Sequence, residues 1–233
     1  ALSRAQAGDI VLLHGCCHNP SGVDLSVDQW LRVATLCEQG GLIPFVDVAY
    51  QGLGEGLQAD AAPLRLLAER LPEFIVASSC SKNFGLYRER AGGLAIVAGS
   101  ASACDMASNQ AMVAARQIWS MPPAHGADIV ATLLADSPLK TEWIAELEAV
   151  RQRILAMRQL LVERANGNRA GCDFSAILNQ RGMFSFLGIS AAQVVALREQ
   201  FGVYMVDSTR INLAGINSAN IDHLSEALYQ VLV

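Results

Sequence analysis

The sequence lacks any apolar run as long as a membrane-spanning helix, which needs roughly 20 residues. The longest apolar runs, residues 91–99 and 129–135, are much shorter. Basic residues are also fewer than acidic ones, with 17 Lys and Arg against 22 Asp and Glu, so the net charge is −5. This balance argues against nucleic acid as the main partner. A composition of 52% hydrophobic and 17% charged residues excludes intrinsic disorder and is typical of a soluble globular protein.

Lysine is scarce, since only Lys82 and Lys140 occur in the chain. Any chemistry that needs a lysine amine therefore has two candidates. Lys140 is expected in the first turn of a helix, where the helix dipole mildly disfavours a cation. We predict that Lys140 is exposed and dispensable.

The features of a secreted protein are missing as well. No signal pattern follows Ala1, which is not an initiator Met, and we expect the chain to be a trimmed or internal piece of a longer protein. Cys16 and Cys17 are adjacent, and the other four cysteines are scattered through a chain long enough to bury a core. This pattern favours reduced thiols and predicts a cytoplasmic protein.

Alternating strands and helices predict an α/β fold for the first half of the chain. Apolar runs predict strands at residues 10–14, 42–48, 74–79 and 92–98. Helices are predicted at 26–40, which opens with a capping box at Ser26 and Gln29, at 63–71 and at 101–119. This alternation favours a parallel sheet in a doubly wound arrangement.

A long amphipathic helix separates the two halves. Ser137 and Pro138 suit its N-cap and first position, and apolar residues recur at intervals of three and four from Trp143 to Leu161. After the turn-rich residues 166–171, strands are predicted at 175–178, 183–187, 203–206 and 210–213, and helices at 191–201 and 219–233. We predict a partial large domain over residues 1–135, a linking helix over 136–166 and a small α+β domain over 167–233.

Ligands of parallel α/β sheets bind beyond the carboxyl ends of the strands, where residues 14–22, 47–51 and 78–83 are expected. In the third of these turns, Lys82 follows a buried strand, and a desolvated lysine can act as a nucleophile or form a Schiff base. Ser79, Ser81 and Arg90 could bind an anion such as phosphate. The alternative is a solvent-exposed lysine in an ordinary loop.

The second turn contains Asp47 and Tyr50. A carboxylate near the end of a buried strand needs a cationic or hydrogen-bonding partner, and a protonated ring nitrogen of a cofactor is one such partner. Tyr50 could then bond a phenolic oxygen on the same ring. The alternative is a structural Asp that caps a helix or bonds backbone amides.

The first turn reads His14-Gly-Cys-Cys-His-Asn-Pro-Ser-Gly22 and holds four potential zinc ligands. Structural zinc sites place two or more residues between paired cysteines, so adjacent ligands fit poorly. We predict no metal. Asn19 and Pro20 fit a rigid turn that presents the Asn amide.

These three turns closely resemble those of the class I pyridoxal-phosphate aminotransferases, and above all the aspartate and aromatic amino acid aminotransferases. The segments Ser120–Gly126, Gly182–Phe186 and Arg210–Gly215 continue the match in the same order. The resemblance covers essentially the whole chain. It implies an α/β fold of the PLP-dependent transferase type (fold type I), with an incomplete doubly wound large domain and a small α+β C-terminal domain.

The resemblance implies a cofactor, pyridoxal 5′-phosphate, and a catalytic residue, Lys82, that holds it as a Schiff base and shuttles a proton. Asp47 matches the residue that pairs with the pyridinium nitrogen, which sustains the electron sink. Tyr50 and Asn19 match the pair that hydrogen-bonds the ring oxygen of the cofactor. The implied phosphate ligands are Ser79, Ser81 and Arg90.

The resemblance also implies how substrates bind. Arg210 matches the arginine that binds the substrate α-carboxylate, and Phe184 matches a residue lining the substrate pocket. Arg116 matches an arginine that reaches the site of the neighbouring subunit and binds a side-chain carboxylate, which implies a homodimer with shared active sites. The implied reaction moves an amino group between aspartate or an aromatic amino acid and a 2-oxo acid such as 2-oxoglutarate.

Some residues depart from the family pattern. Met121 replaces an Asn, Trp119 replaces a Tyr, and Cys80 stands where an aromatic residue is common. The family's N-terminal segment, with a phosphate-binding loop and a residue that stacks on the cofactor, has no counterpart in residues 1–9. The alternatives are therefore a truncated, catalytically inactive aminotransferase-like module that binds the cofactor or is structural, and a decarboxylase or β-eliminating enzyme with the same cofactor.

Overall fold

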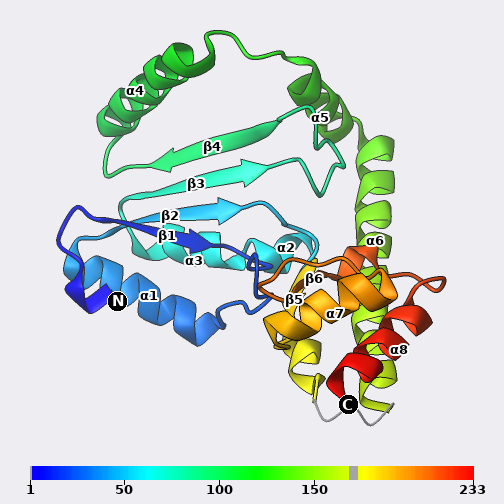
Figure 1. Cartoon of the computed structure of the whole chain (residues 1–233). Helices are drawn as coiled ribbons and strands as arrows, with labels where there is room; N and C mark the ends of the chain where they lie inside the picture. Colours follow the sequence, from blue (N-terminus) through cyan, green and yellow to red (C-terminus); the bar gives the residue numbers. More distant parts are fainter. Residues whose placement is uncertain (1, 168–172) are drawn as a thin grey trace. The chain divides into compact units, whose positions relative to one another are not determined.

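The computed structural model describes residues 2–167 and 173–233 (Figure 1). The chain divides into two compact units. The first unit comprises Ala1–Cys16, Leu25–Gly52 and Gly56–Leu147, and the second comprises Cys17–Asp24, Leu53–Glu55 and Glu148–Val233. Among the described residues, no helix is both long and apolar enough to cross a bilayer. The division at residues 1–135, 136–166 and 167–233 stays a prediction.

A four-stranded sheet organises the first unit, in the order β1-β2-β3-β4 (Figure 1). Its strands are β1 (Ile10–His14), β2 (Ile43–Val48), β3 (Phe74–Ser79) and β4 (Gly92–Val97). The first three strands are parallel, but β4 runs antiparallel to β3. The predicted parallel sheet is therefore confirmed for β1, β2 and β3 and wrong for β4. A parallel return needs a crossover, usually a helix, and residues 80–91 between β3 and β4 contain none.

One face of this sheet packs on the helices α1 (Val27–Gly40) and α3 (Ala62–Arg70). Alternation along β2 buries Pro44, Val46 and Val48 completely, whereas the intervening residues, Asp47 among them, are half-buried on the other face. The predicted capping box of α1 is confirmed, because the Ser26 side chain accepts from the Gln29 amide and the Gln29 side chain accepts in return. The helix ends at Gly40 and is capped by Gly41, whose left-handed backbone (φ 62°) suits glycine.

The first unit also contains the short helices η1 (Leu2–Arg4) and α2 (Leu57–Asp60), together with α4 (Ala101–Trp119), α5 (His125–Ala135) and the first turns of α6 (Ser137–Gly167). The predicted N-cap of α6 is wrong by one residue. The carboxylate of Asp136 accepts a hydrogen bond from the backbone amide of Leu139 at 2.9 Å, so Asp136 caps the helix and Ser137 is its first residue. The predicted exposure of Lys140 is confirmed.

The second unit consists of the rest of α6, η2 (Ser175–Asn179), β5 (Phe184–Phe186), α7 (Ala191–Phe201), β6 (Arg210–Asn212), η3 (Leu213–Gly215) and α8 (Ile221–Leu232). β5 and β6 form an antiparallel pair. The strand predicted at 175–178 is wrong, because the backbone there forms a 3₁₀ turn that buries Phe174 and Ile177, three residues apart. Residues 203–206, also predicted as a strand, pair with no described strand. Residues 168–171 of the expected turn lie outside the described residues.

Candidate functional site

Asp47 and Tyr50 lie at the carboxyl end of β2, in the first unit. The backbone carbonyl of Asp47 accepts from the amide of Gly15, which follows β1, at 2.9 Å. The Asp47 side chain is half-buried and, within the described part of the chain, has no hydrogen-bond or salt-bridge partner. The Tyr50 side chain is buried. A carboxylate without an internal partner is thus available to a cationic ligand.

Lys82 lies in the turn that follows β3, next to Tyr50. Its ammonium nitrogen is 4.7 Å from the centre of the Tyr50 ring, within the range of a cation–π contact. Lys82 is half-buried, and its ammonium forms no salt bridge with the described residues. The other lysine, Lys140, is exposed on α6. The structure therefore distinguishes the two lysines, and only Lys82 lies at the carboxyl ends of the parallel strands.

Two hydroxyl groups precede Lys82, that of Ser79 at the end of β3 and that of Ser81 in the turn. The Ser79 hydroxyl donates to the Ser81 hydroxyl at 3.0 Å and accepts from the Ser81 amide at 3.1 Å, and Ser81 is almost fully buried. Burial raises the pKa of the thiol of Cys80, which lies between them. Arg90 is exposed, and its guanidinium donates to the carbonyl of Tyr87 at 3.0 Å. Two hydroxyls and a guanidinium on one loop form a donor set suited to phosphate.

Arg210 and Phe184 form a second group, within the second unit. The Arg210 guanidinium donates to the side-chain oxygen of Asn19 at 3.1 Å and lies 4.7 Å from the centre of the Phe184 ring. The pairing of β5 with β6 holds Phe184 opposite Asn212. A half-buried guanidinium on an aromatic ring suits a carboxylate attached to an apolar side chain.

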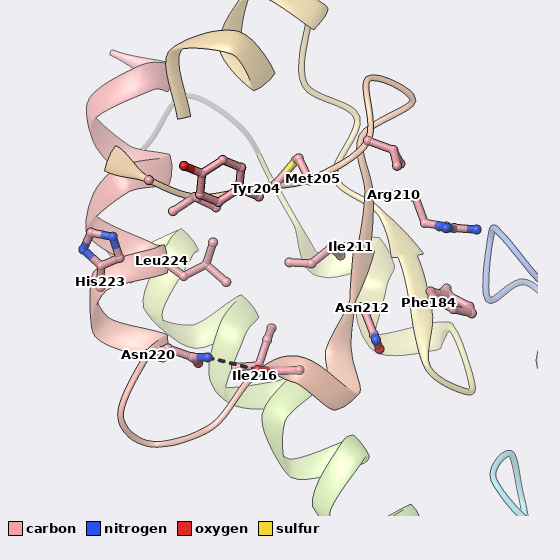
Figure 2. A pocket seen from close by; sticks show the side chains of 14 residues that line it. Phe184, Tyr204, Met205, Arg210, Ile211, Asn212, Ile216, Asn220, His223 and Leu224 are labelled. Carbon is pink, nitrogen blue, oxygen red and sulfur yellow. Dashed lines mark hydrogen bonds between the residues drawn. The ribbon is translucent and has the colours of Figure 1, made fainter. Parts of the chain in front are cut away.

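A pocket of about 660 Å³ extends from Arg210 and Phe184 within the second unit (Figure 2). Arg210 and Phe184 lie at one side of this pocket, and His223 and Tyr204 lie at the other. The imidazole of His223 contacts the carbonyl of Phe201 at 2.8 Å. Most of the remaining lining is apolar, including Ile211, Ile216 and Leu224.

The loop that carries Asn19 is fixed by backbone contacts. The Asp24 carboxylate accepts from the amides of Cys17 at 2.7 Å and His18 at 2.8 Å. Gly182 (φ 77°) packs directly on this loop, because a Cβ on Gly182 would lie 2.4 Å from the Cβ of Cys17. The amide of Arg181 donates to the carbonyl of Gly22 at 2.7 Å. Asn19 therefore reaches Arg210 from a rigid loop.

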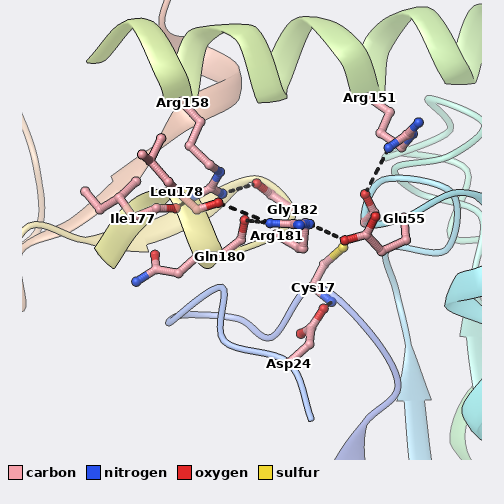
Figure 3. Close-up of polar contacts among 11 residues, drawn as sticks. Cys17, Asp24, Glu55, Arg151, Arg158, Ile177, Leu178, Gln180, Arg181 and Gly182 are labelled. Atoms are coloured by element: carbon pink, nitrogen blue, oxygen red, sulfur yellow. Dashed lines mark hydrogen bonds and ion pairs between the residues drawn. The ribbon is translucent and has the colours of Figure 1, made fainter. Parts of the chain in front are cut away.

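Arg158 of α6 is fully buried, and its side chain points toward Ile177 and Gly182 (Figure 3). Its guanidinium donates to the carbonyl of Ile177 at 3.1 Å, the carbonyl of Gly182 at 2.7 Å and the hydroxyl of Ser185 at 2.5 Å. No carboxylate pairs with it among the described residues, and burial lowers its pKa to about 10. Sequence reasoning missed this residue, although Arg158 stands four residues after Ile154 and three before Leu161, at the spacing of the apolar stripe.

The candidate residues thus form two groups and one separate position. Within the first unit the structure describes Asp47, Tyr50, Ser79, Ser81, Lys82 and Arg90 at the strand ends and the turn after β3. Within the second unit it brings together Asn19, Phe184 and Arg210. Arg116 is exposed near the end of α4. The roles of these residues remain predictions.

Comparison with known proteins gives concordant results. The family model described as aminotransferase class I and II matches residues 1–228. The aromatic-amino-acid aminotransferase of Paracoccus denitrificans is 46% identical, over 99% of this chain and 58% of its own length. The aspartate aminotransferase of Escherichia coli K12 is 50% identical, over 100% of this chain and 59% of its own length. The crystal structure of an aromatic-amino-acid aminotransferase from Burkholderia pseudomallei, covalently bound to pyridoxal phosphate, matches with a TM-score of 0.97 at 45% identity, over 100% of this chain and 58% of that one.

The fold is accordingly that of the PLP-dependent transferases of fold type I, as the sequence predicts. The chain belongs to the class I and II aminotransferase family. It spans between one half and two thirds of the length of the curated relatives it matches, 58–59% for those named here.

Proposed function

We propose that the protein is an aminotransferase that moves an amino group between aspartate or an aromatic amino acid and a 2-oxo acid such as 2-oxoglutarate. The observation that carries the proposal is the position of Lys82, with its ammonium against the Tyr50 ring at the end of the parallel strands. Relatives with 46% and 50% identity are named for aromatic and aspartate substrates. Their names support both donors and rank neither.

The residues of the first unit fit pyridoxal phosphate by their chemistry. Asp47 offers a carboxylate that has no partner among the described residues, and Ser79, Ser81 and Arg90 offer phosphate donors on one loop. The bound cofactor supplies an electron sink for negative charge at the substrate α-carbon. Asp47 would keep the ring nitrogen protonated, and Tyr50 would hydrogen-bond the ring oxygen.

Lys82 would carry out the covalent and acid–base work. Its amine would hold the cofactor, as lysine amines hold carbonyl compounds. The same amine would move the proton at the substrate α-carbon, because it is the one amine of the described chain at the strand ends. Lys140 is exposed and is not expected to contribute.

The second unit would bind the substrate. Arg210 would hold the α-carboxylate through two parallel hydrogen bonds while Asn19 and the Phe184 ring fix the guanidinium. Phe184 would pack against an aromatic donor. Arg116 would bind the side-chain carboxylate of aspartate or glutamate in the site of a partner subunit.

Homodimer formation is supported by α4, none of whose described residues is buried. Large apolar side chains are exposed on this helix and just after it, namely Met106, Met112, Val113, Ile118, Trp119 and Met121. Exposed apolar surface of this extent is typical of a protein–protein interface. A cytoplasmic location is supported by the five described cysteines, which are all free thiols.

Transamination assays test the proposal. The protein, loaded with pyridoxal phosphate, would be assayed with aspartate, tyrosine and phenylalanine as donors to 2-oxoglutarate. We expect turnover in the wild type and in Lys140→Arg, and none in Lys82→Ala. Cofactor binding without turnover for any donor would favour the inactive module. Identical spectra of wild type and Lys82→Ala after cofactor addition would exclude cofactor binding through Lys82.

A further inference from the structure

Trp143, in the first turns of α6, contacts the two residues that follow Lys82. Its indole nitrogen donates a hydrogen bond to the carbonyl of Asn83 at 2.8 Å. Its ring also stacks on Phe84, with the ring centroids 4.4 Å apart and the planes 11° from parallel. All of these residues lie within the first unit. The indole thus fixes both a backbone acceptor and a side chain of the lysine turn.

The same stretch of α6 holds the neighbouring turn, which carries Tyr50. Leu147 lies one helical turn after Trp143 and is buried against Gly52, where a Cβ would lie 2.4 Å from the Cδ2 of Leu147. The side-chain amide of Asn83 connects the two turns by donating to the carbonyl of Gln51 at 3.2 Å. One helix face therefore fixes both turns whose side chains meet at the contact between Lys82 and Tyr50.

The lysine turn also has bonds of its own. The Ser81 amide donates to the Ser79 hydroxyl at 3.1 Å, and the Cys80 amide donates to the carbonyl of Ala91 at 3.0 Å. The internal backbone bonds of the turn are Phe84 to Cys80 at 3.3 Å and Gly85 to Lys82 at 3.1 Å. Loss of the indole would remove the hydrogen bond from Trp143 to this turn. The carbonyl of Asn83, a half-buried residue, would then lack that donor.

We propose that Trp143 is a positioning residue for Lys82: it holds the turn so that the lysine amine stays against the Tyr50 ring. This inference rests on the proposed role of Lys82 as the cofactor-binding lysine. Trp143 touches neither reacting group, and its effect would pass through Asn83 and Phe84.

The scarcity of lysine allows a test without cofactor. The protein would be acylated with limiting acetic anhydride, and modification of Lys82 would be measured by mass spectrometry relative to Lys140 and to free lysine in the same tube. Because Lys82 is half-buried against a ring, its labelling ratio should be low in the wild type. In Trp143→Leu we expect the ratio to rise about threefold to tenfold, because the interaction free energy of a stacked aromatic pair corresponds to a factor of about this size.

Two further variants make the test specific. Trp143→Phe preserves a stacking ring but not the N–H donor, and it should give an intermediate ratio. Ile144→Ala is the matched control, because Ile144 is the exposed neighbour of Trp143 on α6, and it should leave the ratio unchanged. Thermal unfolding would confirm that each variant is folded.

The outcomes are distinguishable. A wild-type ratio in folded Trp143→Leu would overturn the positioning role, whatever the cofactor does. If Trp143→Leu does not fold, Trp143→Phe decides, and a wild-type ratio in that variant overturns the proposal. A wild-type protein that fails to bind pyridoxal phosphate at Lys82 would instead refute the proposed function.

Discussion

The ammonium of Lys82 lies 4.7 Å from the centre of the Tyr50 ring, so the turns after β3 and β2 meet at one cation–π contact. These turns follow neighbouring parallel strands, in which residues 45–48 pair with residues 75–78. The contact places the lysine amine at the strand ends before any ligand is bound. Pre-organised geometry of this kind reduces the entropy lost when a substrate reacts.

Arg210 is expected to control carboxylate binding. Arg210→Lys keeps the charge but cannot form two parallel bonds, and we expect binding of 2-oxoglutarate, the acceptor of the proposed reaction, to weaken by roughly 1.5–3 kcal/mol. Isothermal titration calorimetry would measure the change. Arg164→Lys is the control, because Arg164 is exposed and pairs with Asp222 at 3.5 Å. Equal loss in both variants would argue against a carboxylate site at Arg210.

Arg158 is expected to be a stability determinant. Arg158→Met would leave the carbonyls of Ile177 and Gly182 and the Ser185 hydroxyl without their donor, and we expect a loss of about 2–4 kcal/mol in the free energy of unfolding. Urea unfolding would measure it. Arg153→Met is the comparison, since Arg153 donates to the carbonyls of Ile216 and Ala214 from a more exposed position on the same helix. A smaller loss in Arg158→Met than in Arg153→Met would contradict the buried role.

Gly182 is expected to tolerate no side chain. A Cβ there would lie 2.4 Å from the Cβ of Cys17, in a backbone with φ 77°. We expect Gly182→Ala to lower the free energy of unfolding by roughly 1–2 kcal/mol for a side chain in the left-handed backbone, and by about 1–3 kcal/mol more for overpacking against Cys17. Gly188 has φ 71°, and a Cβ there would meet no atom within 4 Å, so Gly188→Ala should carry the left-handed penalty alone. Equal thermal shifts would show that the Cys17 loop moves aside freely.

Glu148 is expected to make stability depend on acid pH. Hydrogen bonds from Arg151 and then Gln152 lower its pKa from 4.5 to about 2. The unfolded chain therefore binds more protons between these two values, so this contribution to stability is present above pH 4.5 and is lost as pH falls towards 2. The difference in urea midpoint between wild type and Glu148→Gln should shrink across this window. The neighbouring Glu146→Gln serves as control, and a constant difference would contradict the pairing.

Local signals in the sequence predict much of the fold. β1, β3, α4 and α7 have the predicted bounds, and the capping box predicted at Ser26 is confirmed, because apolar runs and capping residues are local features. The direction of β4 could not be predicted in this way, since it depends on how the chain returns after β3. The run at 203–206 has strand-like composition, but strand formation needs a partner.

The candidate site likewise contains residues that the sequence predicts and residues that only the structure reveals. Lys82, Asp47 and Arg210 carry chemistry that their residue types and motifs indicate. Trp143 and Arg158 act through bonds to backbone carbonyls 60 and 24 residues away in sequence, at Asn83 and Gly182. The periodicity of apolar residues in a helix does not indicate which distant carbonyl a side chain will bond. Both residues lie within the regular pattern of a long helix.

The measurement that decides the role of Lys82 is a map of where pyridoxal phosphate attaches. The protein would be incubated with the cofactor, reduced with borohydride, digested and analysed by mass spectrometry. We expect the adduct on the peptide containing Lys82, retained in Lys140→Arg and lost in Lys82→Arg. Modification of Lys140 to the same extent, or an adduct that persists in Lys82→Arg, would contradict the assignment of Lys82 as the cofactor-binding lysine.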